Sequence, residues 1–186
     1  IDTNDNLNLF DLSDKNSKKI GEVNTAYIHE VIGVQNGICG LFAPSGKVST
    51  STQPSRIVGF EISSGRELWN RQLARDAFAD FRGTKPYAMT PNEVVISPFA
   101  RDDSDVIKPV VQSYSLEDGS LRWSTSLPFP LAKDSNVLRN YDTANMLITS
   151  KSVYISAVRF AGSPILRTFV LNRSDGSIQM EHTGYT

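Results

Sequence analysis

Three stretches of the chain align with one another and decide the fold: IVGFEISSGRELW at residues 57–69, VQSYSLEDGSLRW at 111–123 and TFVLNRSDGSIQM at 168–180. We align them on Phe60, Tyr114 and Phe169, which are 54 and 55 residues apart. In this alignment the third copy carries two extra turn residues, and a degenerate fourth copy, NLFDL, occupies residues 8–12. Repetition at a near-constant period indicates a fold built from one repeated unit.

Each copy predicts a β-hairpin. Val58, Phe60 and Ile62 alternate with other residues, which is the period-two pattern of a half-buried strand. The turns end in glycine, which adopts positive φ, and their Asp or Ser side chains bond back to the backbone. A large apolar residue follows each turn glycine by four positions, and we interpret it as packing between neighbouring units. The structural repeat residues are therefore Gly65 with Trp69, Gly119 with Trp123, and Gly176 with Met180.

Two further strand-like runs precede each complete hairpin, so the unit is four antiparallel strands in roughly 54 residues, the size of a β-propeller blade. The runs are 30–34 and 38–42, 87–89 and 93–97, and 146–149 and 153–158. We predict an all-β fold, a single partial β-propeller domain over residues 1–186 with about three and a half blades. Its parts are a blade remnant at 1–23 and blades at about 24–73, 82–127 and 141–183.

A short helix is expected between two of the blades. Leu73, Ala77 and Phe81 fall at helical spacing within residues 71–81.

Three and a half blades are fewer than the four to eight of most propellers, and an interrupted ring leaves sheet edges open. Three explanations stay open: the chain is part of a longer propeller, it pairs with a second chain that completes the ring, or it closes as an unusual four-bladed ring. The start at Ile1, inside an expected strand, favours the first.

Composition excludes several classes of protein. The formal net charge is −1 with no block of like charge, which argues against a nucleic-acid partner. Cys39 is the single cysteine, so an intrachain disulfide and a multi-cysteine metal site are both excluded. No apolar stretch approaches the roughly 20 residues that cross a bilayer.

The hairpins resemble the quinoprotein-type (PQQ-like) β-propeller repeat. Gly65 and Trp69, and again Gly119 and Trp123, match the glycine and tryptophan of the pattern apolar-Ala-Leu-Asp-x-x-Thr-Gly-x-x-x-Trp, and Asp11 keeps its aspartate. The resemblance implies one of two functions. Quinone-dependent dehydrogenases of this fold hold calcium, a quinone and often a vicinal disulfide; non-enzymatic members, such as periplasmic outer-membrane-assembly lipoproteins and lumenal scaffold domains, have lost the cofactor site.

No residue can be matched by motif to the calcium ligands or the catalytic aspartate, so we expect no catalytic, cofactor-binding or resident metal residue in this chain. Weak candidates for a calcium site are three carboxylates in one loop, because Ca²⁺ prefers several oxygen ligands. They are Asp102, Asp103 and Asp105. Neither His29 nor His182 has a carboxylate or a nucleophile near it in the sequence at a spacing typical of a catalytic site. Cys39 lies in an apolar strand, and we interpret it as a small buried hydrophobic residue.

Long loops join the second and third strands of each unit, at 44–55, 100–109 and 160–166. In a meander they emerge on one face, where a rigid scaffold can present them for recognition. The leading hypothesis is a non-catalytic scaffold outside the cytoplasm that binds protein partners through this face. The alternatives are the propeller portion of a quinone-dependent dehydrogenase, and a carbohydrate-binding propeller using aromatic residues between blades. Those residues are Tyr27, Tyr87, Phe129 and Tyr141.

Overall fold

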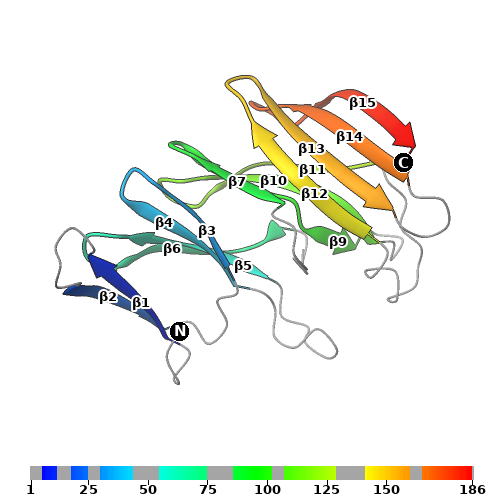
Figure 1. Ribbon diagram of the computed structural model, residues 1–186. Helices are drawn as coiled ribbons and strands as arrows, with labels where there is room; N and C mark the ends of the chain where they lie inside the picture. Colours follow the sequence, from blue (N-terminus) through cyan, green and yellow to red (C-terminus); the bar gives the residue numbers. More distant parts are fainter. Residues whose placement is uncertain are drawn as a thin grey trace.

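A computed structural model describes most of the chain as antiparallel strands (Figure 1). The described residues are 6–11, 18–24, 30–43, 55–74, 86–101, 107–128, 141–159 and 165–185. No helix among them is long and apolar enough to cross a membrane. The prediction of an all-β chain made of four-stranded antiparallel sheets is confirmed.

The strands form one hairpin and three larger sheets. The hairpin pairs β1 (Asn6–Asp11) with β2 (Lys18–Asn24). Blade 1 consists of β3 (Glu30–Gln35), β4 (Ile38–Ala43), β5 (Arg56–Glu61) and β6 (Glu67–Gln72). Blade 2 consists of β7 (Tyr87–Thr90), β8 (Glu93–Ile96), β10 (Ile107–Ser115) and β11 (Leu121–Ser126), with the short β9 (Phe99–Arg101) paired to β10. Blade 3 consists of β12 (Tyr141–Ile148), β13 (Ser152–Arg159), β14 (Ile165–Asn172) and β15 (Ile178–Tyr185).

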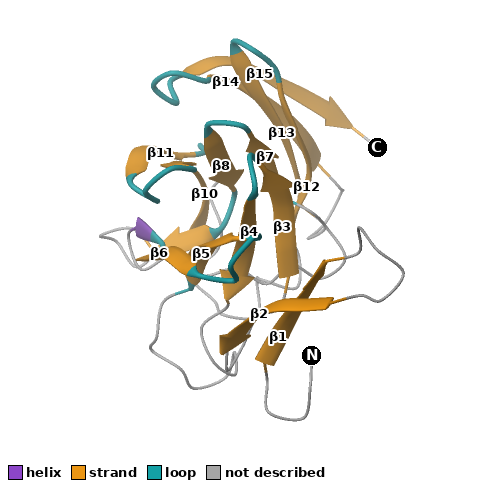
Figure 2. Ribbon diagram, turned by 90° about the vertical axis from the view of Figure 1, so that its left-hand side faces the viewer, coloured by secondary structure: helices purple, strands orange, loops and turns teal. Residues whose placement is uncertain are grey.

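The three blades stand side by side with their first strands together. β7 contacts β3 on one side and β12 on the other, and the view turned by 90° shows these three strands adjacent (Figure 2). Two hydrophobic clusters fill the spaces between the sheets. One joins blades 1 and 2 around Ile57, Trp69 and Tyr114; the other joins blades 2 and 3 around Trp123 and Phe169. Each blade is therefore stabilised mainly by its neighbours.

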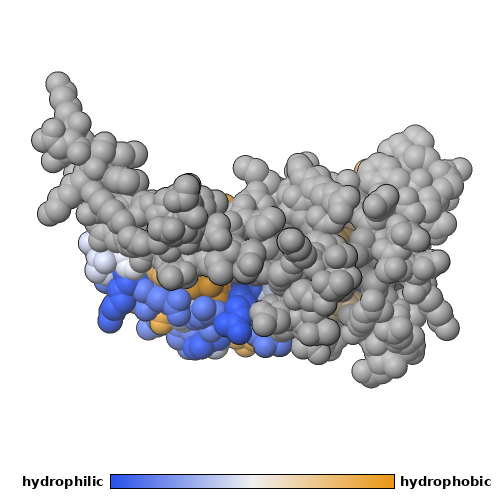
Figure 3. Space-filling view, turned by 90° about the horizontal axis from the view of Figure 1, so that it is seen from below, coloured by the Kyte–Doolittle hydropathy of each residue, from blue (hydrophilic) through white to orange (hydrophobic). Residues whose placement is uncertain are grey.

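The outer strand of blade 1 carries polar side chains where it meets solvent. In β6, Trp69 is buried whereas Glu67, Arg71 and Gln72 are exposed. Seen from below, the described side chains that reach the surface are mainly hydrophilic (Figure 3). Charged side chains on a strand edge oppose unwanted pairing with other strands.

The turns joining third and fourth strands are built alike in all three blades. The turn glycine donates its N–H to the carbonyl four residues earlier: Gly65 to Glu61, Gly119 to Ser115 and Gly176 to Asn172. The φ angles of the three glycines are 70°, 69° and 74°, a region that other residues enter only with strain.

An acidic side chain also braces two of these turns. Asp118 accepts hydrogen bonds from the N–H and hydroxyl of Ser120, and Asp175 does the same with Ser177. These bonds favour the ionised carboxylates, lowering the pKa of Asp118 to about 2 and lowering that of Asp175 as well.

The alignment of the third repeat on Phe169 is wrong by two residues. Phe60 pairs with Glu67 and Tyr114 with Leu121, and the corresponding pair in blade 3 is Leu171 with Ile178. The third turn therefore has no extra residues. Side chains alternate between the faces of a sheet with period two, so a slip of two residues keeps every side chain on its own face and leaves the apolar pattern unchanged.

The helix expected over residues 71–81 is wrong at its start. Arg71 and Gln72 belong to β6, where they pair with Ile57 and Arg56. The N–H of Leu73 then bonds to the Ser55 carbonyl, and its side chain is buried between blades 1 and 2. Cross-strand pairing outweighs the helical spacing of the apolar residues at this point. Residues 75–81 lie outside the described part of the chain.

Substitution of the turn glycines separates backbone strain from packing. A Cβ at Gly176 would lie 2.4 Å from Trp123, whereas a Cβ at Gly37 would meet nothing within 4 Å, although both glycines have φ of 74°. We expect Gly37→Ala to lower the free energy of unfolding by about 1–2 kcal/mol, from strain alone. Gly176→Ala adds a steric clash and should cost about 2–5 kcal/mol in total. Urea unfolding measures both values, and equal losses would contradict the proposed packing of Trp123.

Candidate functional site

The short turns of the blades gather at one end of the sheets. In an antiparallel meander, the turns between first and second strands and between third and fourth strands share one end. The loops between second and third strands lie at the other. The long loops predicted to carry recognition, 44–55, 100–109 and 160–166, lie for the most part outside the described residues. The candidate site is therefore drawn from the end that carries the short turns.

A depression of about 490 Å³ lies at this end, on the boundary between blades 2 and 3. Charged and polar side chains from both blades line it: Glu93, Arg122, Ser150, Lys151, Asn172, Arg173, Ser174 and Gln179.

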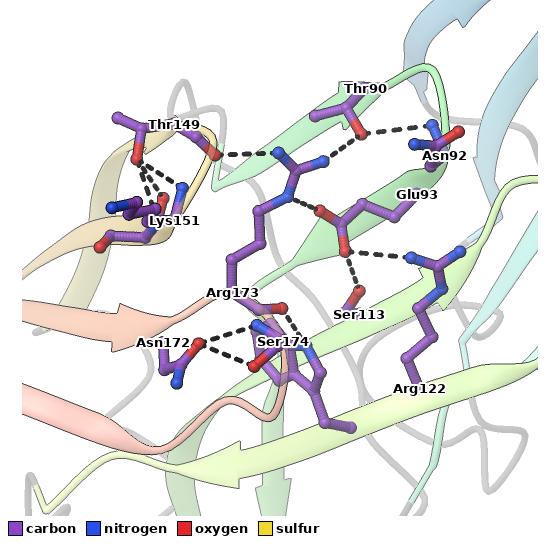
Figure 4. Close-up of polar contacts among 12 residues, drawn as sticks. Thr90, Asn92, Glu93, Ser113, Arg122, Thr149, Lys151, Asn172, Arg173 and Ser174 are labelled. Atoms are coloured by element: carbon purple, nitrogen blue, oxygen red, sulfur yellow. Dashed lines mark hydrogen bonds and ion pairs between the residues drawn. The ribbon is translucent and has the colours of Figure 1, made fainter.

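The floor of the depression is a buried carboxylate. Glu93, the first residue of β8, is only 1% exposed. Its side chain accepts a hydrogen bond of 2.6 Å from the hydroxyl of Ser113 and another from Nε of Arg173. The Arg122 guanidinium lies 3.9 Å away on the solvent side (Figure 4). A charge buried this deeply is stable only when it is paired, and Arg173 supplies the opposite charge.

Arg173 ties the two blades together. Its other guanidinium nitrogens donate to the Thr149 carbonyl of blade 3 at 2.9 Å and to the Thr90 hydroxyl of blade 2 at 3.1 Å (Figure 4). Its own carbonyl accepts the indole N–H of Trp123 at 2.9 Å. One turn residue thus holds the carboxylate of Glu93, two loop ends and the buried tryptophan.

The boundary between blades 1 and 2 shows what the repeat requires at this position. There the indole N–H of Trp69 donates to the Leu116 carbonyl at 2.8 Å, as Trp123 does to Arg173. Ile38 is the residue of blade 1 that corresponds to Glu93 of blade 2. Ile38 pairs with Glu61 and Glu93 pairs with Ser115, and Glu61 and Ser115 occupy equivalent positions in the third strands of the two blades. Ile38 packs with buried Leu116 in an apolar cluster. The same position is apolar at one boundary and an ion pair at the next.

Sequence reasoning missed this pair. Aligning the hairpins on their turn glycines places Arg173 beside Ile62 and Leu116, both apolar, and so exposes a change from apolar to charged. The alignment on Phe169 hid the change, because it placed Arg173 among supposed extra turn residues.

Four of the six predicted structural repeat residues lie at the blade boundaries: Trp69 with Gly119, and Trp123 with Gly176. Trp69 is 4% exposed and lies over the turn glycine Gly119; Trp123 is 7% exposed and lies over Gly176. A Cβ on either glycine would come within 2.7 Å or less of the indole. Met180, at the third equivalent position, is 61% exposed. The φ of the remaining residue, Gly65, is 70°.

Met180 belongs to an apolar row on the outer face of blade 3. Direct pairing places Leu147 beside Tyr154, Tyr154 beside Val170 and Val170 beside Met180. Leu147 is 62% and Tyr154 38% exposed. The opposite face of the same blade carries Ile155 and Phe169, both buried against blade 2.

Other predicted candidates contribute little to the site. The calcium candidates Asp102, Asp103 and Asp105 lie outside the described residues, as does His29. Within the part of the chain that is described, no group of three or more His, Cys, Asp or Glu side chains is placed to hold a metal ion. The buried carboxylate of Glu93 is bound to Arg173. His182 is exposed on β15, and burial raises the pKa of the Cys39 thiol.

Of the four aromatic residues considered for carbohydrate binding, one has a described side chain. Tyr87 is 8% exposed and belongs to the cluster between blades 1 and 2. It therefore does not form an exposed platform. Tyr27 and Phe129 lie outside the described residues, and for Tyr141 only the backbone is described.

The Glu93–Arg173 pair yields a stability prediction. Glu93→Gln leaves a partly buried Arg173 without its counter-charge and should lower the free energy of unfolding by about 3–5 kcal/mol. The double variant Glu93→Ile with Arg173→Leu installs the residues of the blade 1–2 boundary. It should be close to the parent, because apolar replacement of a buried ion pair is often neutral or stabilising. Urea unfolding tests both. A single variant as stable as the parent would show that the pair is not coupled.

Comparison with known proteins identifies the fold. No protein-family model and no curated protein sequence matches the chain. Among solved structures, BamB from Moraxella catarrhalis aligns with a TM-score of 0.53 at 14% identity, covering 89% of this chain and 41% of BamB. A europium-containing methanol dehydrogenase aligns with a TM-score of 0.63 at 10% identity, covering 95% of this chain and 38% of the enzyme. Quinohemoprotein alcohol dehydrogenase from Comamonas testosteroni aligns at 0.53 and 12% identity, covering 89% and 30%.

The chain thus spans less than half the length of these structures. At such identities the likeness shows the fold alone, and the predicted fold class is confirmed: the chain folds as part of a β-propeller, the fold of these structures.

Proposed function

We propose that the chain is part of a non-catalytic propeller that serves as a scaffold for protein partners, without a bound cofactor. The observation that supports the proposal most is that the buried carboxylate of Glu93 is fully engaged in bonds within the protein. It is the one carboxylate buried among the described side chains, and Arg173 and Ser113 hold it. A carboxylate bound in this way is not free to ligate a cation or to accept a proton from a substrate. Its bonds join blades 2 and 3 instead.

We place the protein outside the cytoplasm. This proposal is supported by the resemblance of its hairpins to the quinoprotein-type repeat, whose non-enzymatic members include extracytoplasmic scaffolds. The fold shared with BamB is compatible with it.

We further propose that another propeller blade covers the outer face of blade 3. Trp69 and Trp123, at the position of Met180, are each buried by the following sheet and its turn glycine. Unlike tryptophan, methionine has no N–H that needs a carbonyl partner. The covering blade therefore has to supply only an apolar face and a closely packed turn. Such a blade can be supplied by additional residues of the same polypeptide or by a second polypeptide chain.

Thiol labelling tests this cover. Cys39, the single cysteine of residues 1–186, is 4% exposed and should react slowly with a maleimide, and the unsubstituted protein gives the background rate. In the protein with its whole natural sequence, Met180→Cys should react roughly tenfold more slowly than Leu121→Cys, because burial restricts access to a thiol. Leu121 is a suitable control because it is 45% exposed at a blade edge. Equal rates for the two variants would show that no blade covers Met180.

A quinone-dependent dehydrogenase is the second candidate function, because two of the similar structures are dehydrogenases. Two measurements on the protein purified from its native source decide between the candidates. If the protein is a scaffold, we expect chemical cross-linking to capture a defined protein partner. We also expect no dye reduction with alcohols or sugars after addition of pyrroloquinoline quinone and Ca²⁺. An active quinoprotein assayed in parallel validates the dye. Quinone-dependent dye reduction would overturn the scaffold proposal.

A further inference from the structure

The charged depression between blades 2 and 3 is a departure from the structural repeat. At the preceding boundary the same position is filled by Ile38 and Leu116, which shows that apolar packing satisfies the fold there. A buried ion pair offers little stability over apolar side chains of similar volume. Glu93 and Arg173 therefore point to a role beyond holding the blades together.

The charges that line the depression are predominantly positive. Glu93 is the one carboxylate in the lining, against the three cations Arg122, Lys151 and Arg173. Glu93 pairs with Arg173 and lies 3.9 Å from Arg122, so the lining keeps a net positive charge. The side chain of Arg122 is 43% exposed, and Lys151 is exposed on the turn between β12 and β13. The pairing of Glu93 with Arg173 also keeps the carboxylate from repelling an anion. Asp175, in the adjoining turn, is bound to Ser177 and does not line the depression.

A second, more apolar depression of about 310 Å³ adjoins the first. Its apolar lining residues are Ile38, Pro91 and Leu116. Its polar lining residues are Asn36, Asn92, Glu117 and Arg122. Arg122 lines both depressions, so the two lie on either side of its side chain at the turn end of the blades. An extended surface with an apolar part and a basic part suits a peptide segment better than a small anion.

We propose that this surface binds an extended peptide segment in which an apolar residue lies next to acidic residues. The apolar side chain occupies the depression lined by Ile38 and Leu116. The carboxylates lie against Arg122 and Lys151, where charge-assisted hydrogen bonds hold them. The inference rests on the proposed scaffold function and specifies the chemistry of its partner.

Fluorescence anisotropy tests the proposal with a defined probe. The probe is a fluorescein-labelled peptide of about eight residues, long enough to extend roughly 26 Å, that alternates leucine with pairs of glutamate. A matched peptide carries glutamine in place of glutamate and should bind roughly tenfold more weakly, since charge-assisted hydrogen bonds are about twice as strong as neutral ones. Binding of the acidic peptide should weaken as salt is raised from about 50 to 300 mM, because salt screens exposed charges.

Three variants of the whole protein localise the binding. Arg122→Gln introduces the residue that blade 3 carries at the equivalent position, Gln179, so the fold should tolerate it. Lys151→Gln changes an exposed turn residue. Each should weaken binding of the acidic peptide roughly tenfold, because each removes a charged donor. Arg66→Gln, with 70% of the Arg66 side chain exposed beside a blade 1 turn, should change binding by less than about twofold, since exposed pairs contribute little.

Three results would overturn the inference: unchanged binding in both Arg122→Gln and Lys151→Gln, equal affinity for the two peptides, or competition by inorganic phosphate or citrate as effective as competition by unlabelled peptide. The last result would indicate a small-anion site. Any of them leaves the scaffold proposal standing if the quinone assay is negative and a cross-linked partner is found. A positive quinone assay would instead remove the scaffold function itself.

Discussion

The packing of an indole from one blade over the turn glycine of the next is the interaction on which the architecture depends. Trp69 meets Gly119 and Trp123 meets Gly176, at distances that leave no room for a Cβ. Each indole also donates its N–H to a carbonyl of the facing turn. Burial and hydrogen bonding thus act together at one point, and they set the spacing and register of neighbouring sheets.

This constraint leaves the residues around it free to vary. Beside the indole contact, the blade 1–2 boundary carries Ile38 and Leu116, and the blade 2–3 boundary carries Glu93 and Arg173. Both sets fill the space between sheets, but only the second produces a polar, cationic depression at the surface. A repeat protein can therefore acquire a binding surface at one boundary without loss of the interblade contacts.

The similarity to dehydrogenases and to BamB concerns the fold. One fold supports several functions, so likeness at 10–14% identity is informative about the fold and not about the chemistry. The chemistry has to be read from the side chains that the repeat does not require. Here those are Arg122, Lys151, Arg173 and Glu93.

The strands, the turns and the four-stranded unit could be predicted from the sequence, because the alternation of apolar residues and the turn glycines are local properties. The tertiary structure pairs Leu171 with Ile178, which is the register that alignment on Gly176 gives. Apolar alternation leaves this register open, because a two-residue slip from Leu171 to Phe169 preserves the alternation. The tertiary structure resolved that choice. It also replaced the start of the expected helix by β6, where Arg71 pairs with Ile57. The Glu93–Arg173 pair joins residues 80 positions apart, and such a contact exists only once two blades pack together.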